Sequence, residues 1–370
     1  TMVMRNHLIT LACMLIAFIA NAGIPVENTF CAEGFVFQIV NEQERYVVIP
    51  APIDYPNGID DTRLYHTQPV KRLVVPPEVT DPATGIKYSV LAAELTWCDA
   101  VEELVISQGI KEISAHDMSV KKVELPESVE YLNIRSMPLE ELMLPASLKE
   151  LCGDCLPAIS CLDIKTLCVP ESVKKLEVAI HWCDALSYIE LPGVEYIEGS
   201  LSHLESLKKL VFSPKLSYVD GVEYTSPDEI WFPSDGNEYP WKIMTSSFAE
   251  CHPKAIYCAR TNPPVFDRDL AETFRPGIDN ESWVMFGGSE HMKDIILYVR
   301  PECVGAYRAT PNWGLMDIRP YDFTNGLPVA IADSNDVNGR SFDLSGRETN
   351  PSVAPSGIYI IDGEKRIIGH

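Results

Sequence analysis

Residues 120–132 read VKKVELPESVEYL, and this phrase occurs in eight copies between Val70 and Asn237. The other copies read VKRLVVPPEVT, VEELVISQGIKEI, LEELMLPASLKEL, IKTLCVPESVKKL, LSYIELPGVEYI, LKKLVFSPKLSYV and PDEIWFPSDGN. The residue after the last strand position is Pro76, Ser107, Pro126, Pro145, Pro170, Pro192, Ser213 and Pro233 in turn. Such a short and recurring spacing is typical of stacked repeats, so the phrase predicts a solenoid.

The first half of a copy alternates apolar and polar residues, as in Val123, Glu124 and Leu125. This alternation predicts a short strand with one buried face, and the proline that usually follows ends the strand. The second half places apolar residues three apart, as in Val173 and Leu176, which predicts a second inward wall. Because one copy buries too little surface, neighbouring copies must stack to form a core. We therefore expect a mainly β solenoid of short stacked strands and turns.

The charge balance excludes some partners. The chain has 370 residues, of which 46% are hydrophobic, and 53 acidic residues against 30 basic ones give a formal charge of −23. A solenoid grows by stacking, so this length need not divide into separate domains. Without a basic stripe, nucleic acid and anionic membrane surfaces are not expected as partners.

The first 22 residues resemble a secretory signal peptide. Arg5 precedes an apolar run from Leu8 to Ala20, and the small residues of 20–22 end it. This order of basic, apolar and small residues predicts export with cleavage after Ala22. The run is shorter than a spanning helix requires, so no transmembrane segment is expected after cleavage.

The remaining chain divides by pattern. FVFQIV and YVVIP predict two strands in a capping segment over residues 23–69, and the repeats cover 70–240. Degenerate repeats and a C-terminal cap follow over 241–321. Residues 322–370 predict a polar linker and a small β tail, with Asp362 and Gly363 as the turn of a hairpin.

The phrase resembles the BspA-like leucine-rich repeat of exported Bacteroidetes-type surface proteins. A cysteine upstream of the phrase belongs to this resemblance, as Cys98 in TWCDAVEELVI and Cys183 in HWCDALSYIEL. IYCARTNPPVF and ILYVRPECVGAYRATPNW resemble the family's closing repeats, with Tyr307 and Trp313 in the aromatic places. The resemblance implies a leucine-rich-repeat solenoid at the cell surface or outside the cell, with an adhesive or protein-binding role. It transfers no ligand.

The cysteines are interpreted mainly as structural. Cys98 and Cys183 recur at one repeat position, where a buried thiol acts as a small apolar filler. Eleven cysteines in an exported chain also leave one or two disulfides open. Cys152 and Cys155 form a C-x-x-C pair, but they lie between strand-forming repeats, away from the helix N-terminus that activates such pairs. With Cys161 and Cys168 they match no zinc spacing, so neither redox chemistry nor a metal is expected.

Two other motifs are incomplete. The polar stretch 333–339 has Val337 where a calcium loop needs an oxygen ligand, which favours a linker. In residues 287–291, GGSEH, His291 stands where a serine nucleophile turn needs glycine, which favours a loop. We therefore expect no enzyme activity and no cofactor.

The outward face of the repeat strands is left as the expected functional surface. One outward row has mixed charge and consists of Arg72, Glu103, Lys122, Glu141, Thr166, Tyr188, Lys209 and Glu229. The next row is unusually apolar and consists of Val74, Val105, Glu124, Met143, Cys168, Glu190, Val211 and Trp231. Exposed apolar rows are often contact sites, although Val and Trp also suit strands wherever they lie. The predicted binding residues are Val74, Val105, Met143, Tyr188, Val211 and Trp231.

The favoured function is protein–protein interaction or adhesion, with a host or microbial surface protein as partner. A glycan-binding accessory protein is the first alternative, with Tyr188, Trp231 and Trp241 as stacking platforms. A periplasmic scaffold is the second alternative. A hydrolase or thiol enzyme with an unrecognised site is the third.

Overall fold

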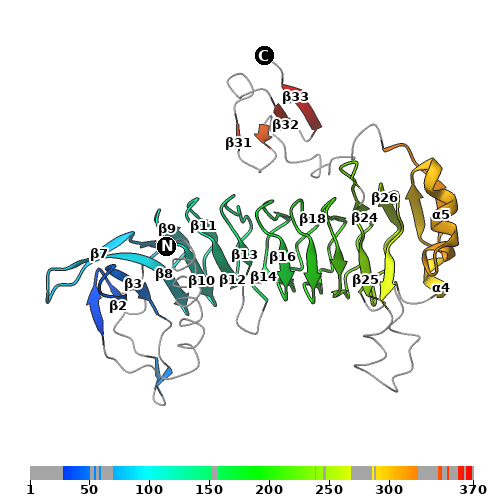
Figure 1. The fold of residues 1–370 in the computed structure, drawn as a ribbon. Coiled ribbons are helices and arrows are strands. Elements are labelled where there is room, and N and C mark those ends of the chain that lie inside the picture. The colour runs from blue at the N-terminus through cyan, green and yellow to red at the C-terminus, as the bar shows by residue number, and fades with distance from the viewer. Residues whose placement is uncertain are drawn as a thin grey trace.

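The structure, a computed structural model, describes residues 28–50, 70–151, 157–237, 239–244, 247–265, 286 and 290–323. It describes the backbone alone for 54–55, 58–59, 266–267, 289, 341–343, 348–349, 357–361 and 364–368. Short strands stack along one axis, from β2 at one end to helix α5 at the other (Figure 1). The predicted mainly β solenoid is confirmed.

One turn of the solenoid contains three strands, each on its own wall. Strand β18 (Tyr188–Glu190) is followed by β19 (Tyr196–Glu198) and β20 (Leu201–Ser202), and β21 (Lys209–Val211) then pairs beside β18. All stacked pairs of these turns are parallel. The repeated phrase supplies the first wall and the second wall, as predicted. The third wall was not predicted.

The first wall is formed by two parallel sheets. A three-stranded sheet contains β6 (Arg72–Val75), β9 (Glu103–Ile106) and β11 (Lys122–Glu124). A seven-stranded sheet then contains β15 (Thr166–Cys168), β18, β21, β24 (Glu229–Phe232), β26 (Ala255–Cys258), β28 (Ile296–Val299) and β29 (Asp317–Pro320). The copy LEELMLP lies between the two sheets, and its residues 138–149 have no strand assignment.

The other two walls have shorter strands. The second wall contains β16 (Lys175–Glu177), β19, β22 (Tyr218–Val219), β25 (Lys242–Met244) and β27 (Val265–Asp267). The third wall is a twelve-stranded sheet made of β1 (Thr29–Ala32), β2 (Phe35–Asn41), β3 (Tyr46–Ile49), β7 (Glu78–Thr80), β8 (Lys87–Thr96), β10 (Glu112–His116), β12 (Tyr131–Met137), β13 (Glu150–Leu151), β14 (Ile159–Leu162), β17 (Ile180–His181), β20 and β23 (Val222–Glu223).

Both ends of the repeat body carry non-repeat elements. Strands β1, β2 and β3 are antiparallel neighbours, and β3 joins the repeats through β8. The other end contains α4 (Ser289–Met292), α5 (Val304–Ala309) and two 3-10 turns at Pro301–Cys303 and Trp313–Leu315. The side chains of Tyr307 and Trp313 are fully buried against the last turns.

Two small antiparallel sheets complete the described strands. Strands β4 (Asp54–Tyr55) and β5 (Gly58–Ile59) form a pair. The tail sheet has the order β31 (Glu348–Thr349), β30 (Ser341–Asp343), β32 (Gly357–Ile361) and β33 (Glu364–Ile368). Ile361 pairs with Glu364, which agrees with the predicted two-residue hairpin turn. The signal peptide and the linker stretch 333–339 lie outside the described residues.

The core is a continuous ladder of aliphatic side chains. Leu167, Ile189, Leu210 and Ile230 occupy one inward row of the first wall and are buried, each paired with the next. Truncating such a residue to alanine costs about 2–5 kcal/mol in well-packed cores. Among the helices that the structure describes, none is long and apolar enough to cross a membrane.

Candidate binding surface

The strand register confirms which residues share the outward rows. Val74 pairs with Val105 in the three-stranded sheet, and Val211 pairs with Trp231 in the seven-stranded sheet. Arg72 pairs with Glu103 in the same way. Since side chains alternate across a strand, these rows point away from the core. The predicted alignment of the eight copies is therefore correct on the first wall wherever strands are assigned.

The N-terminal part of the first wall keeps apolar side chains exposed. Val74 is 41% exposed and Met143 is 55% exposed, while Val105 is half-buried. Val105 lies one rung along from Val74, and Met143 lies in the copy between the two sheets. These three residues, which we call the open row, are the predicted binding residues that a partner could contact most easily.

An ion-pair network lies beside the open row. Glu103 contacts Arg72 at 3.0 Å and Lys122 at 3.2 Å, and Lys122 also contacts Glu124 at 2.6 Å. The network follows successive strands of the three-stranded sheet, so it neutralises the mixed-charge row locally. Exposed pairs of this kind stabilise proteins only slightly, by about 0–1 kcal/mol each. Their main effect here is to hold long polar side chains beside Val74 and Val105.

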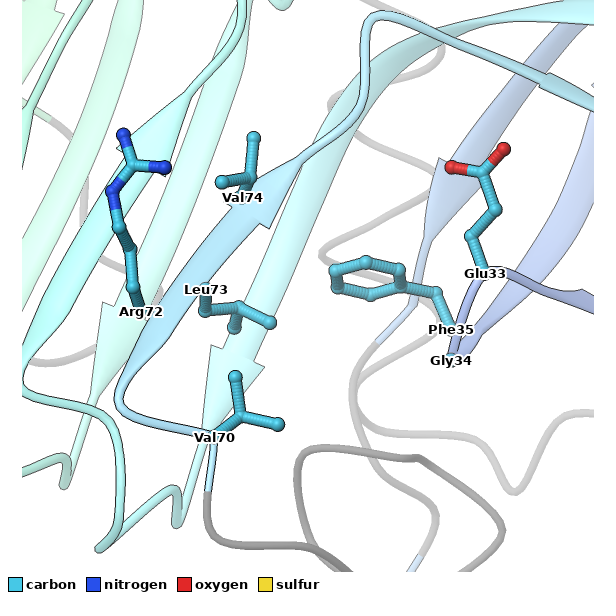
Figure 2. A pocket seen from close by; sticks show the side chains of 7 residues that line it. All are labelled: Glu33, Gly34, Phe35, Val70, Arg72, Leu73 and Val74. Carbon is cyan, nitrogen blue, oxygen red and sulfur yellow. The ribbon is translucent and has the colours of Figure 1, made fainter.

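An open pocket of about 220 Å³ lies where the N-terminal strands meet the first repeat strand. Figure 2 shows Glu33, Gly34 and Phe35 across from residues of β6, including Arg72 and Val74. Strand β6 is the edge strand of its sheet, so this end of the open row borders a recess as well as a flat surface. Sequence reasoning did not find the pocket, because the cap residues that line it lie outside the phrase.

Two predicted binding residues are not exposed. Trp231 is 0% exposed and Val211 is 5% exposed, so the expectation of an open apolar row there is wrong. Tyr257 stacks on Trp231 with ring centroids 3.9 Å apart, and the ammonium of Lys209 lies 4.5 Å from the indole centroid. The indole N–H donates to Glu229 at 2.8 Å. Neighbouring side chains thus cover Trp231 completely, although its strand position is outward.

The sequence analysis also did not predict that Trp231 belongs to a larger aromatic cluster. Tyr298 stacks on Tyr257 at 4.7 Å, and the ring edge of Tyr321 contacts Trp231, Tyr257 and Tyr298. AIYC and ILYV carry these two tyrosines at the position of Trp231 in EIWF, which is the sequence signal that could have found them. Burial raises the pKa of Tyr257 to about 12.

This cluster argues against the stacking platforms of the glycan alternative. Sugar rings bind to exposed aromatic faces, but the faces here are occupied by the neighbouring rings. Trp241 is only 2% exposed and donates to the carbonyl of Asn262 at 2.9 Å, so it is a core residue. Tyr188 is half-buried, and its hydroxyl donates to Glu190 at 3.0 Å. Of the three proposed platforms, Tyr188 alone has an accessible ring.

The repeated phrase, its register and its continuous aliphatic core together decide the fold. The repeat body is a β-solenoid of stacked parallel strands.

Comparisons with known proteins found similar solved structures. No protein-family model and no curated protein matches the chain. A leucine-rich repeat protein from Bacteroides ovatus is 16% identical, with a TM-score of 0.41 over 73% of this chain and 70% of that chain. A leucine rich cell surface protein from Faecalibacterium prausnitzii is 12% identical, with a TM-score of 0.22 over 66% of this chain and 92% of that chain. Neither likeness assigns a partner to this solenoid.

The cysteines of the solenoid do not assemble into a site among the described residues. Cys98 and Cys183 are buried, as the filler interpretation predicted. Cys161 and Cys168 are exposed on different walls, in β14 and β15. Within the described ranges, no group of three or more His, Cys, Asp or Glu side chains is placed to hold a metal ion. Cys152 and Cys155 lie outside those ranges.

One local prediction is corrected in part. The stretch 287–291 was expected to be a loop, but residues 289–291 begin helix α4. The ring of His291 lies edge-on to His252, with centroids 4.7 Å apart. This contact gives the histidine a packing partner.

The solenoid has a second aromatic group, which follows the third wall and is exposed, unlike the cluster around Trp231. Trp182 stacks on His203 at 5.7 Å, and His203 stacks on Tyr224 at 4.9 Å. Trp182 is 45% exposed and Tyr224 is 44% exposed. We call these three residues the corner stack. Sequence reasoning missed it because they lie outside the aligned phrase.

A neutral histidine supports the corner stack. His181 Nε2 donates to the carbonyl of Gly199 at 2.7 Å, since a carbonyl can only accept, and Nδ1 then accepts from the hydroxyl of Ser202 at 2.8 Å. Burial lowers the pKa of His181, the nearby His203 lowers it further, and the bond to Gly199 raises it. The folded state therefore binds this proton less readily than the unfolded state does.

This lowered pKa predicts a pH-dependent stability. As the pH falls below the ordinary histidine pKa of 6.5, the unfolded chain takes up the proton first. The free energy of unfolding therefore decreases as the pH falls, until the pKa of His181 in the folded state is reached. A pKa that is lower by one in the folded state corresponds to a loss of about 1.4 kcal/mol in the free energy of unfolding at low pH. Urea unfolding between pH 7.5 and 5.0 should show a steeper loss for the natural chain than for His181→Gln. Equal slopes for the two chains would contradict the assignment.

Proposed function

We propose that the chain is an exported, cell-surface leucine-rich repeat protein that binds another protein and has no enzymatic activity. The observation that carries the proposal is the open row of Val74, Val105 and Met143 on an extended sheet surface. Apolar side chains exposed beside ion pairs are typical of contact surfaces. The leader-like residues 1–22 and the resemblance of the repeats support export. The partner is a host or microbial surface protein.

Protease treatment of intact producing cells tests the location. We expect added protease to degrade the chain while a cytoplasmic marker in the same cells stays whole. Lysed cells provide the control that the chain is cleavable. A chain that resists protease on intact cells and is cleaved after lysis would favour the periplasmic scaffold.

Binding of the labelled chain to target cells tests the partner class. Val74→Ser, Val105→Thr and Met143→Gln together remove the open row but leave the ion pairs of Arg72 and Glu103 in place. We expect at least a tenfold loss of binding, because apolar anchors carry most of the energy of such contacts. Protease pretreatment of the target cells should also abolish binding.

The matched control changes an exposed apolar residue of the second wall, Val265→Thr, which is 61% exposed in the natural chain. It should bind like the natural chain. Binding that survives protease but is lost after glycosidase pretreatment would support the glycan-binding alternative.

A further inference from the structure

The tripeptide Trp-Cys-Asp occurs twice at one position of the solenoid, at residues 97–99 and 182–184. Both tryptophans have left-handed backbones, with φ of 55° and 51°, and they are 39% and 45% exposed. Both cysteines are buried, and each thiol donates to the carbonyl two residues before it, at 3.2 and 3.4 Å. The same local structure therefore presents a tryptophan and an aspartate to solvent on two different turns.

A row of left-handed residues joins the two tripeptides. It follows the ends of successive strands of the third wall, and its members are Trp97, Asp117, Ser136, Cys161, Trp182, His203, Tyr224 and Glu250. Trp97 and Trp182 are separated by four strand-to-strand steps, through β10, β12, β14 and β17. At about 4.8 Å a step, the separation is about 19 Å. An extended peptide covers this distance with about six residues.

The row has a one-sided charge. A second row lies two residues further along each turn, within about 7 Å of the first, and contains Asp99, Ser119, Pro138, Asp163, Asp184, Glu205, Ser226 and His252. Neither row contains lysine or arginine. Asp99, Asp163, Asp184 and Glu205 are exposed and form no ion pair with another described residue. These carboxylates thus lack the ion pairs that neutralise the first wall.

We propose that this corner of the third wall binds an extended, arginine-rich polypeptide segment that lies along the solenoid axis. Guanidinium groups pair with carboxylates and stack on exposed indole faces, so one residue type satisfies both rows. His203 is enclosed between its two neighbours, but Trp182 ends the corner stack where the next rung carries only the thiol of Cys161. The ring of His181 lies tilted against Trp182, with centroids 5.3 Å apart, and Trp182 is 45% exposed, so part of its indole is accessible to a planar cation.

The chemistry favours a cationic peptide over a sugar. Carboxylates only accept hydrogen bonds, and the chain's charge of −23 attracts cations over a distance. This inference goes beyond the proposed function, because it concerns a different wall and a partner defined by charge.

Fluorescence anisotropy with a labelled peptide of ten arginines tests the proposal on the purified chain. We expect saturable binding that weakens as salt rises from about 50 to 200 mM, as screened ion pairs do. Trp182→Asn with Tyr224→Asn should weaken binding at least tenfold, and asparagine tolerates the left-handed backbone. Asp163→Asn, Asp184→Asn and Glu205→Gln together should have a similar effect. A peptide of ten glutamates should not bind.

The matched control removes three charges elsewhere: Glu42→Gln, Glu171→Gln and Glu302→Gln. All three residues are exposed and form no ion pair with another described residue. This control variant should change the affinity for the arginine peptide less than twofold. Equal weakening by the two charge variants would overturn the proposal, because net charge alone would then explain binding. Full affinity in the aromatic variant, or displacement of the peptide by dextran, would also overturn it. Loss of cell binding in the open-row variant would leave this result unchanged.

Discussion

Replacing Arg260 with alanine is expected to destabilise the C-terminal end of the solenoid by about 4 kcal/mol, the range for breaking a buried charged network. The guanidinium is 6% exposed and donates to the carbonyls of Leu216, Ser213 and Pro214 at 2.8, 3.1 and 2.8 Å. It also lies 4.5 Å from the ring centroid of Trp241. Alanine would leave the carbonyls of Leu216 and Pro214 without this donor, whereas that of Ser213 keeps the bond from the N–H of Leu216 at 3.2 Å, and it would leave a cavity beside the indole.

Two variants separate the planar hydrogen-bond donors of the Arg260 guanidinium, which we call its fork, from its positive charge. Arg260→Lys keeps a cation but cannot reach three carbonyls in one plane, so we expect a loss of about 2 kcal/mol. Arg300→Ala removes a single bond, from Nε to the carbonyl of Ala259 at 2.6 Å, and should cost about 1 kcal/mol. Urea unfolding followed by tryptophan fluorescence and circular dichroism measures all three. A loss below about 1 kcal/mol for Arg260→Ala would refute the role of the fork.

A second large effect is expected at Gly221, which lies between β22 and β23. Its φ is +81°, and a Cβ there would lie 2.3 Å from Gly199 Cα and 2.4 Å from Gly199 N. Backbone atoms cannot move aside as a side-chain end can, so the two stacked turns would have to separate. We expect Gly221→Ala to cost about 3–5 kcal/mol, from left-handed strain together with overpacking.

Gly236 provides the matched control for this collision. Its φ of +88° is nearly the same, but an added Cβ would meet nothing within 4 Å. Gly236→Ala should therefore cost only the strain, about 1–2 kcal/mol. The difference between the two variants in urea unfolding measures the steric contact between neighbouring turns. Equal losses of stability in the two variants would show that the left-handed φ alone determines the cost of each substitution.

The first wall was predictable because its strands repeat a clear alternation. Leu104, Leu167 and Ile230 recur at one place in their copies, so both the inward ladder and the outward rows followed from alignment alone. The third wall was not predictable in this way. Strands such as β17 and β20 have two residues each, which is too short for a period to be recognised.

The exposed fraction of a strand side chain was harder to predict than the face of the sheet to which it points. Val74 and Trp231 share one outward row, yet one is 41% exposed and the other is 0% exposed. The difference comes from Tyr257 and Tyr321, which lie beyond the eight copies and cover the indole. A repeat alignment assigns the side of a sheet on which a residue lies. It does not report how large the neighbouring side chains are.

The left-handed row on the third wall also affects how such a chain can change over time. A non-glycine residue in this conformation costs roughly 1–2 kcal/mol, and less for Asn or Asp. The residues of this row are exposed or half-buried. Trp, Asp, Ser, Cys, His, Tyr and Glu all occupy the position here, while the next residue in the turn, such as Cys183 or Leu204, is buried. Substitutions can therefore accumulate along this edge without disturbing the interior. The set of partners that this edge binds can therefore change by substitution at one turn at a time, while the core stays the same.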